Sequence, residues 1–237
     1  MKKVFSILLF ISAMLLSAQK PEQILDQHFR SLGKNLDQVQ SILQKGKMSM
    51  NGIDFPMENY QDTHGKIYSK INMMGNDITV MAFDGKKGYM FDNMSYSYID
   101  IPDSLAQKFQ AQAQHIFGEF YHYDKDKLQL KYLGLQKIDG QSYQAVQIHY
   151  KKPIEADIQD IILYFNPENH LLTFTRATTQ GKIVEVKMDK YQNFDGYLFA
   201  TQVSTKIDGQ IITSINFDQI KINPPEPDPA IFIKPKH

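Results

Sequence analysis

Residues 48–53 read Met-Ser-Met-Asn-Gly-Ile, and this stretch decides the fold. Asn51-Gly52 is the strongest short signal for a two-residue β-hairpin turn, because both residues accept the positive φ angles that such a turn requires. The residues on either side alternate in polarity with period two, as strands do. A hairpin is therefore expected between a strand that ends at Met50 and a strand that covers residues 53–61.

The same alternation continues on both sides of this hairpin, from residue 41 to residue 101. Short turn sequences rich in Gly, Asp and Asn interrupt it at regular intervals. Strict alternation after Gly75 places Ile78 and Met81 on opposite faces of their strand. This half of the chain predicts an antiparallel meander of about six strands.

Two helical segments precede the meander. Residues 21–32 carry apolar side chains at helical spacing; Pro21 suits the first turn of the helix and Gly33 its end. Leu36 and Val39 indicate a second, short helix. Both segments need an apolar surface to cover.

A third helix is predicted after the meander, where Pro102-Asp103-Ser104 offers capping residues. One face of this segment is apolar and the other is rich in glutamine, so the segment is amphipathic. The apolar positions recur every three or four residues and form a single stripe: Leu105, Ala106, Phe109, Ala113, Ile116, Phe117 and Phe120.

Strand patterns resume at residue 128 and continue to residue 220, with hairpin after hairpin and no crossover helix. The Pro-rich residues 223–229 must be extended, and Ile231 and Phe232 are expected to dock on the body. The pattern gives eleven to thirteen strands. We predict a mainly β (α+β) fold: a single strongly curved antiparallel sheet that forms an incomplete β-barrel of about eleven strands, closed by two or three amphipathic helices.

The N-terminus has the order of a secretory signal peptide: basic Lys2-Lys3, an apolar run over residues 4–16, then small residues. The apolar run is shorter than the about 20 residues that span a bilayer. We predict a cleaved signal peptide at 1–19 and one exported domain at 20–237. The chain has no Cys, so no disulfide supports this domain and its core must suffice.

Charge and chemistry-bearing motifs narrow the function classes. The formal charge is zero and Arg30 and Arg176 are the only arginines, so no basic surface for nucleic acid is expected. The seven histidines form no metal-ligand spacing, and no nucleophile, phosphate-loop or carboxylate-pair motif can be recognised. Met48-x-Met50 offers thioethers for Cu(I), but no Cys or His lies beside them. We predict a protein that is not an enzyme and holds no metal or cofactor.

The curved sheet and its few helices predict an apolar cavity. Eight of the eleven methionines lie between Met48 and Met94, and methionine is common on surfaces that accept varied apolar partners. The third helix would then act as a lid. The candidate ligand-binding residues of cavity and lid are Met48, Met50, Ile71, Met73, Val80, Met81, Leu105, Phe109, Ile116 and Phe117.

Short motifs along most of the exported chain resemble a known family. They are Ile24-Leu-Asp-Gln-His-Phe-Arg-Ser-Leu-Gly33, Leu36-x-x-Val39-x-Ser41 followed by Gly46-Lys-Met-Ser-Met50, Ala82-Phe-Asp-Gly85 with Gly88-Tyr89, Gly134-Leu-Gln-Lys-Ile-Asp-Gly140 with Tyr143, Leu163-Tyr-Phe165, Tyr191-Gln-Asn-Phe-Asp-Gly196, and Phe217-Asp-Gln-Ile-Lys-Ile-Asn-Pro-Pro225. In order and spacing they resemble the LolA/LolB-like carriers, the outer membrane lipoprotein-sorting proteins of Gram-negative bacteria. The chain departs from the family at Ala200, where a Pro is common, and Arg176 cannot be matched to the family's functional arginine.

The resemblance implies an incomplete barrel with a helical lid, located in the periplasm. It implies a monomer that carries acyl chains of lipoproteins or free lipids toward the outer membrane, with inner- and outer-membrane transport components as partners. Two other readings of the residues stay open. One is an exported sensor or interaction domain that reads a peptide at its sheet edge; the other is a structural β-protein with a filled interior.

Overall fold

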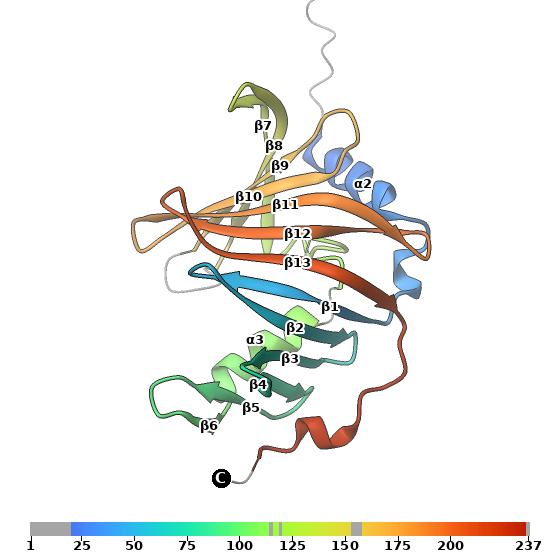
Figure 1. Cartoon of the computed structure of the whole chain (residues 1–237). Coiled ribbons are helices and arrows are strands. Elements are labelled where there is room, and N and C mark those ends of the chain that lie inside the picture. Colours follow the sequence, from blue (N-terminus) through green and yellow to red (C-terminus); the bar gives the residue numbers. More distant parts are fainter. Residues whose placement is uncertain (1–19, 114–115, 119, 153–157, 236–237) are drawn as a thin grey trace, which may run out of the picture.

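A computed structural model describes residues 20–113, 116–118, 120–152 and 158–235 (Figure 1). The predicted signal peptide at 1–19 lies outside the described residues. The described part contains two α-helices, α2 (Pro21–Leu32) and α3 (Asp103–Ala113), and two short 3-10 helices, η1 (Leu36–Gln38) and η2 (Pro229–Phe232). None of its helices is long and apolar enough to span a membrane.

All strands of the described part belong to one antiparallel sheet of 13 strands. The first six form a meander: β1 (Ser41–Met50), β2 (Ile53–Asp62), β3 (Lys66–Met73), β4 (Asn76–Asp84), β5 (Gly88–Asp92) and β6 (Ser97–Asp100). The other seven form a second meander: β7 (Leu128–Ile138), β8 (Gln141–Tyr150), β9 (Asp160–Phe165), β10 (Leu172–Thr179), β11 (Lys182–Phe194), β12 (Tyr197–Ile207) and β13 (Gln210–Ile222).

The two meanders join where β1 pairs with β13, so the strand order runs from β6 through β1 and β13 to β7. β6 and β7 are therefore the two edges, and the sheet is not closed. The chain must pass from one edge to the other between β6 and β7, and α3 lies on this connection, in contact with β3. The predicted mainly β fold, with a single antiparallel sheet that does not close, is confirmed, while the sheet has 13 strands rather than about eleven.

The helices agree with the sequence pattern in part. α2 has the predicted bounds. The second predicted helix is the single 3-10 turn η1. α3 spans Asp103–Ala113, and Ile116 and Phe117 lie in a turn, so the prediction of one helical stripe from Leu105 to Phe120 is wrong.

The sheet has an inner face, on which Phe83 contacts α3, and an outer face, which carries Tyr68. On the inner face α2 buries Ile24 and Leu25 against β7, β8 and β9. Part of the outer face is covered by the C-terminal segment, where Ile231 and Phe232 pack on a cluster of tyrosines as predicted; the buried residues of that cluster are Tyr60, Tyr68, Ala82 and Tyr89.

Candidate functional site

The inner face of β1–β4 gathers several of the predicted ligand-binding residues. The two-residue turn at Asn51-Gly52 pairs Met50 with Ile53 and Met48 with Phe55. Since partners in an antiparallel pair point to the same face, the set continues across the neighbouring strands. Its members on these four strands are Met48, Met50, Ile53, Phe55, Met57, Ile71, Met73, Ile78 and Met81.

The row through Met48 extends into the second meander. Met48 pairs with Ile215 on β13, Ile215 with Val203 on β12, and Val203 with Met188 on β11. All of these side chains are partly exposed. An apolar band therefore crosses the seam between the two meanders on the inner face.

Val80 departs from the predicted pattern. Met81 pairs with Ser69 and Thr79 pairs with Lys70, so Val80 is the extra residue of a β-bulge. The bulge brings Ile78 to the inner face with Met81, although strict alternation placed these two on opposite faces. Val80 itself is 36% exposed, and because it has no partner in the β3–β4 register, the register assigns it to neither face of the sheet.

Burial on the inner face changes along the strands. Phe83 is 1% exposed where it lies near α3, whereas Met73 and Met50 near the hairpin turns are 37% and 40% exposed. The apolar surface is therefore closed at the α3 end and accessible at the turn end. Accessible apolar side chains in one continuous surface are typical of a binding face rather than of a filled core.

α3 covers the closed end through Phe109, whose ring lies 6.1 Å from that of Phe83 at 60°. Leu105 and Phe109 are half-buried, while Gln107 and Lys108 are exposed. The helix is thus held by a narrow apolar strip, and its remaining surface is polar. Such a helix can separate from the sheet at a modest free-energy cost.

Ile116 and Phe117, the other predicted lid residues, lie away from this strip. They pack on the core of β12 and β13 with Val39 and Ile42. The Phe117 ring stacks on Phe199 with centroids 5.5 Å apart and an interplanar angle of 26°. The structure therefore separates Leu105 and Phe109 on α3 from Ile116 and Phe117 in a packed turn.

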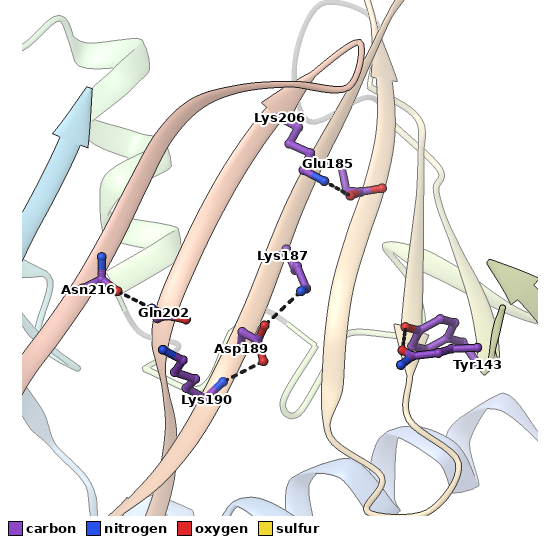
Figure 2. Close-up of polar contacts among 9 residues, drawn as sticks. Tyr143, Glu185, Lys187, Asp189, Lys190, Gln202, Lys206 and Asn216 are labelled. Carbon is purple, nitrogen blue, oxygen red and sulfur yellow. Dashed lines mark hydrogen bonds and ion pairs between the residues drawn. The ribbon is translucent and has the colours of Figure 1, made fainter. Parts of the chain in front are cut away.

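The outer face of β11–β13 is polar (Figure 2). Lys187 Nζ donates to Asp189 Oδ2 at 2.9 Å, and Gln202 Nε2 donates to Asn216 Oδ1 at 2.7 Å. Asp189 has its pKa lowered, chiefly by that hydrogen bond from Lys187. The outer face is therefore polar on β11–β13, whereas on β7–β10 it carries a buried cluster that includes Tyr143, Tyr164 and Phe174.

Arg176 belongs to this outer face. Its Nη2 donates to Glu185 Oε2 at 2.8 Å, and its guanidinium lies 5.5 Å from the Tyr164 ring centre and 5.7 Å from that of Phe174. It has no place in the apolar inner surface.

Two cavities lie outside this surface. The larger, of 890 Å³, lies between the C-terminal segment and β4–β6, and Lys66, Lys234, Asp100 and Glu226 are among its charged lining residues. The other, of 460 Å³, lies beside α2, where His122 Nε2 is 3.0 Å from Asp37 Oδ1. Burial and the neighbouring Asp37 raise the pKa of Tyr121 in this cavity to about 12. Neither cavity contains a predicted ligand-binding residue.

Four inner-face residues of β1–β4 were not among the candidates: Ile53, Phe55 and Met57 on β2, and Ile78 on β4. The sequence contains the signal that would have found the three on β2, since a two-residue turn at Asn51-Gly52 fixes the register of β2 against β1. Ile78 could not have been found in this way, because the bulge at Val80 has no recognisable sequence signal.

By sequence, no protein-family model and no curated protein matches the chain. Among solved structures, a domain described as an outer membrane lipoprotein-sorting protein from Vibrio parahaemolyticus has a TM-score of 0.60 and 9% identity, covering 88% of this chain and 94% of its own. A LolA superfamily protein from Nitrosomonas europaea has a TM-score of 0.55 and 12% identity, with 92% and 99% covered. A DUF1329 family protein from Desulfovibrio piger has a TM-score of 0.57 and 13% identity, with 90% and 98% covered.

These similarities define the class of fold. The open antiparallel sheet with helices on its inner face is a LolA-like fold. At these identities the likeness concerns the fold alone.

Proposed function

We propose that this chain is a periplasmic carrier that holds acyl chains of lipoproteins or free lipids against the inner face and moves them toward the outer membrane. It acts as a monomer, without catalysis and without a metal or cofactor. In this proposal residues 1–19 are a signal peptide that is removed on export, and residues 20–237 form the carrier domain. Its partners are the cargo and the transport components of the two membranes.

The observation that carries the proposal is the accessible apolar band on the inner face. Met48, Met50 and Met73 lie on it, and Met50 and Met73 keep more than a third of their surface exposed. Methionine side chains adapt to ligands of different shape, because they are unbranched and have several rotatable bonds. The LolA-like fold supports the same assignment.

The energetics of acyl binding suit a carrier. A chain of about 16 carbons gains about 10 kcal/mol on burial, before the costs of ordering are subtracted. When cargo enters, α3 gives up the contact between Phe109 and Phe83 and gains contacts with the acyl chain. This exchange reduces the net binding free energy, which allows the cargo to be released.

The experiment uses the mature chain, purified from a periplasm without detergent. We expect mass spectrometry of organic extracts to find stoichiometric acyl species, and Phe109→Asp to lose them while it stays folded. Gln107→Asp places the same charge on the exposed face of α3 and should retain the cargo.

A clean extract from the unmodified chain, together with no uptake of a fluorescent fatty acid, would refute the carrier function. The same fold would then be better explained as an exported sensor or interaction domain. Unfolding of Phe109→Asp would show instead that α3 is part of the core. Retention of cargo by a folded Phe109→Asp would remove α3 from the binding site.

A further inference from the structure

Five hairpin turns meet at one rim of the sheet, since alternate turns of an antiparallel meander lie on the same side. These turns join β1 to β2, β3 to β4, β5 to β6, β10 to β11 and β12 to β13. Figure 1 shows those after β1, β5, β10 and β12 on the left of the molecule. In the described part of the chain, nine of the thirteen exposed large apolar side chains lie in or beside these turns: Met50, Ile53, Met73, Met74, Met94, Tyr96, Ile183, Ile211 and Ile212. We call this set the apolar rim.

The opposite rim has a different composition. Its turns contain residues such as His64, Lys86, Asp139, Glu168 and Asp195. None of the exposed large apolar side chains of the described residues lies in them. The two rims have the same hairpin architecture, so turn formation does not account for the apolar residues on one of them.

Two of these turns carry a methionine that is almost fully exposed to solvent. Met74 is 98% exposed and Met94 is 93% exposed. Asp92 accepts hydrogen bonds from the backbone N–H groups of Met94 and Ser95, which fixes the second turn. Met74 has a φ of 54°, a left-handed conformation that favours Gly or Asn. The chain therefore keeps a large apolar side chain where it costs both exposure and backbone conformational free energy.

We propose that the apolar rim docks on the surface of a neutral, zwitterionic lipid bilayer, with Met74 and Met94 inserted among the headgroups. Met74 and Met94 stand on separate turns, so these two most exposed side chains do not form one apolar core of the kind found at the centre of protein interfaces. A headgroup layer accepts separate apolar side chains with polar neighbours between them. The apolar rim also continues into the inner-face band through Met50 and Met73.

The charges beside the rim select the type of bilayer. Asp54, Asp77, Asp92 and Asp208 flank the turns, whereas Lys182 lies next to Ile183 and Lys206 pairs with Ile211 across β12 and β13. This excess of carboxylates disfavours anionic headgroups, since binding to them depends on clusters of Lys and Arg. Docking should therefore be strongest on phosphatidylcholine vesicles and should change little with salt.

The chain has no Trp, so a single substituted Trp is an unambiguous reporter. With phosphatidylcholine vesicles, the fluorescence of Met74→Trp and of Met94→Trp should shift to the blue and be quenched by brominated lipid. Glu168→Trp, on an exposed turn of the opposite rim, should show neither effect. Absence of a shift at both rim positions, or an equal shift at Glu168→Trp, would overturn the proposal.

A second measurement separates the rim from the acyl site. The double variant Met74→Asp, Met94→Asp should lose at least about tenfold in vesicle affinity by flotation, because two apolar insertions are removed. It should still take up a soluble fluorescent fatty acid, so failure of the rim and failure of the proposed carrier function give different results. Unchanged flotation of the double variant would contradict membrane docking, as would a vesicle-independent dimer that this variant abolishes.

Discussion

His28 on α2 is a buried histidine that contacts the aromatic core. Its ring lies 5.1 Å from Phe29 and 5.2 Å from Phe165, and its Nδ1 is 3.1 Å from the carbonyl oxygen of His170. Burial disfavours the charged ring and lowers the pKa of His28 from 6.5 to about 4, although the hydrogen bond opposes this shift. The ring is therefore neutral in the folded protein at neutral pH.

This pKa predicts a loss of stability in mild acid. In the unfolded chain the pKa of His28 returns to its ordinary 6.5, so between that value and about 4 the unfolded state binds more protons. The free energy of unfolding should therefore fall as the pH drops through this range, by up to about 3 kcal/mol from this residue. Urea denaturation at a series of pH values measures it. His28→Gln should flatten the profile over this pH range, and an unchanged slope in that variant would contradict the role of His28.

Residue by residue, the sequence predicts most where the determinants are local. The hairpin at Asn51-Gly52 placed Met48 and Met50 correctly as neighbours on one face. Ile78 and Val80 were placed wrongly, because a β-bulge shifts every following side chain by one face and depends on packing across the sheet. Arg176 was recognised as a strand residue, but which face it points to depends on non-local strand pairing.

Gly46 lies in β1 at the seam between the two meanders. A Cβ atom there would overlap the carbonyl oxygen of Asn216 and lie 2.8 Å from the Cα atom of Phe217 on β13. The register of the pair shifts at this point, between Lys45 and Gly46. The close approach of the two strands therefore depends on the missing side chain.

Gly46→Ala should separate β1 from β13 locally and lower the free energy of unfolding by about 3 kcal/mol or more, because backbone atoms cannot move aside cheaply. Chemical denaturation measures the loss. Gly52→Ala is the matched control in the turn of the same strand: its Cβ meets nothing within 4 Å, so only its φ of 77° opposes the change, at about 1 kcal/mol. Equal effects of the two substitutions would show that the seam tolerates a side chain.

At the scale of elements, the bounds of α2 and the order of the hairpins could be predicted, since capping residues, turns and periodicity are local signals. The C-terminal end of α3 could not be predicted from the sequence. Helical spacing continues from Leu105 to Phe120, but Phe117 stacks on Phe199 in the core, and this tertiary contact outweighs the local pattern. The predicted lid is thus shorter than its apolar stripe.

The whole molecule is held together on its outer side by the C-terminal segment. Tyr89 Oη donates to the carbonyl oxygen of Ile231 at 2.7 Å, and the Phe232 ring lies 6.4 Å from Tyr68. Lys234 pairs with Asp100 at 2.8 Å on the edge strand β6. The segment therefore ties the edge of the first meander to the last strand of the second.

Removal of the two docked side chains should loosen this tie. Ile231→Ala combined with Phe232→Ala should lower the free energy of unfolding by about 2–4 kcal/mol, because both side chains are half-buried against tyrosines. Thermal unfolding followed by circular dichroism measures the change. Ile233→Ala alters a side chain that is 70% exposed and should stay within about 0.5 kcal/mol of the parent. A neutral double variant would mean that the segment contributes no stability.

The class of the whole fold could be predicted from unbroken hairpins, but the order of the strands could not. The pairing of β1 with β13 joins residues such as Ile42 and Ile222, which lie near opposite ends of the domain's sequence. No local sequence signal marks this pairing.

The pairing of β1 with β13 also has a consequence for how the protein is made. In the proposed export the chain emerges with its N-terminus first, so β1 is available long before its partner strand β13 has been translocated. Until then the backbone groups on one edge of β1 lack their hydrogen-bond partners. Ile24 and Leu25 of α2 likewise stay exposed until β7, β8 and β9 are available to bury them. Pairings between distant segments form slowly and leave apolar surface open to aggregation. Folding of this protein can therefore be completed only after β13 is available, and a chain that stops before β13 should be degraded by proteases rather than form a smaller stable domain.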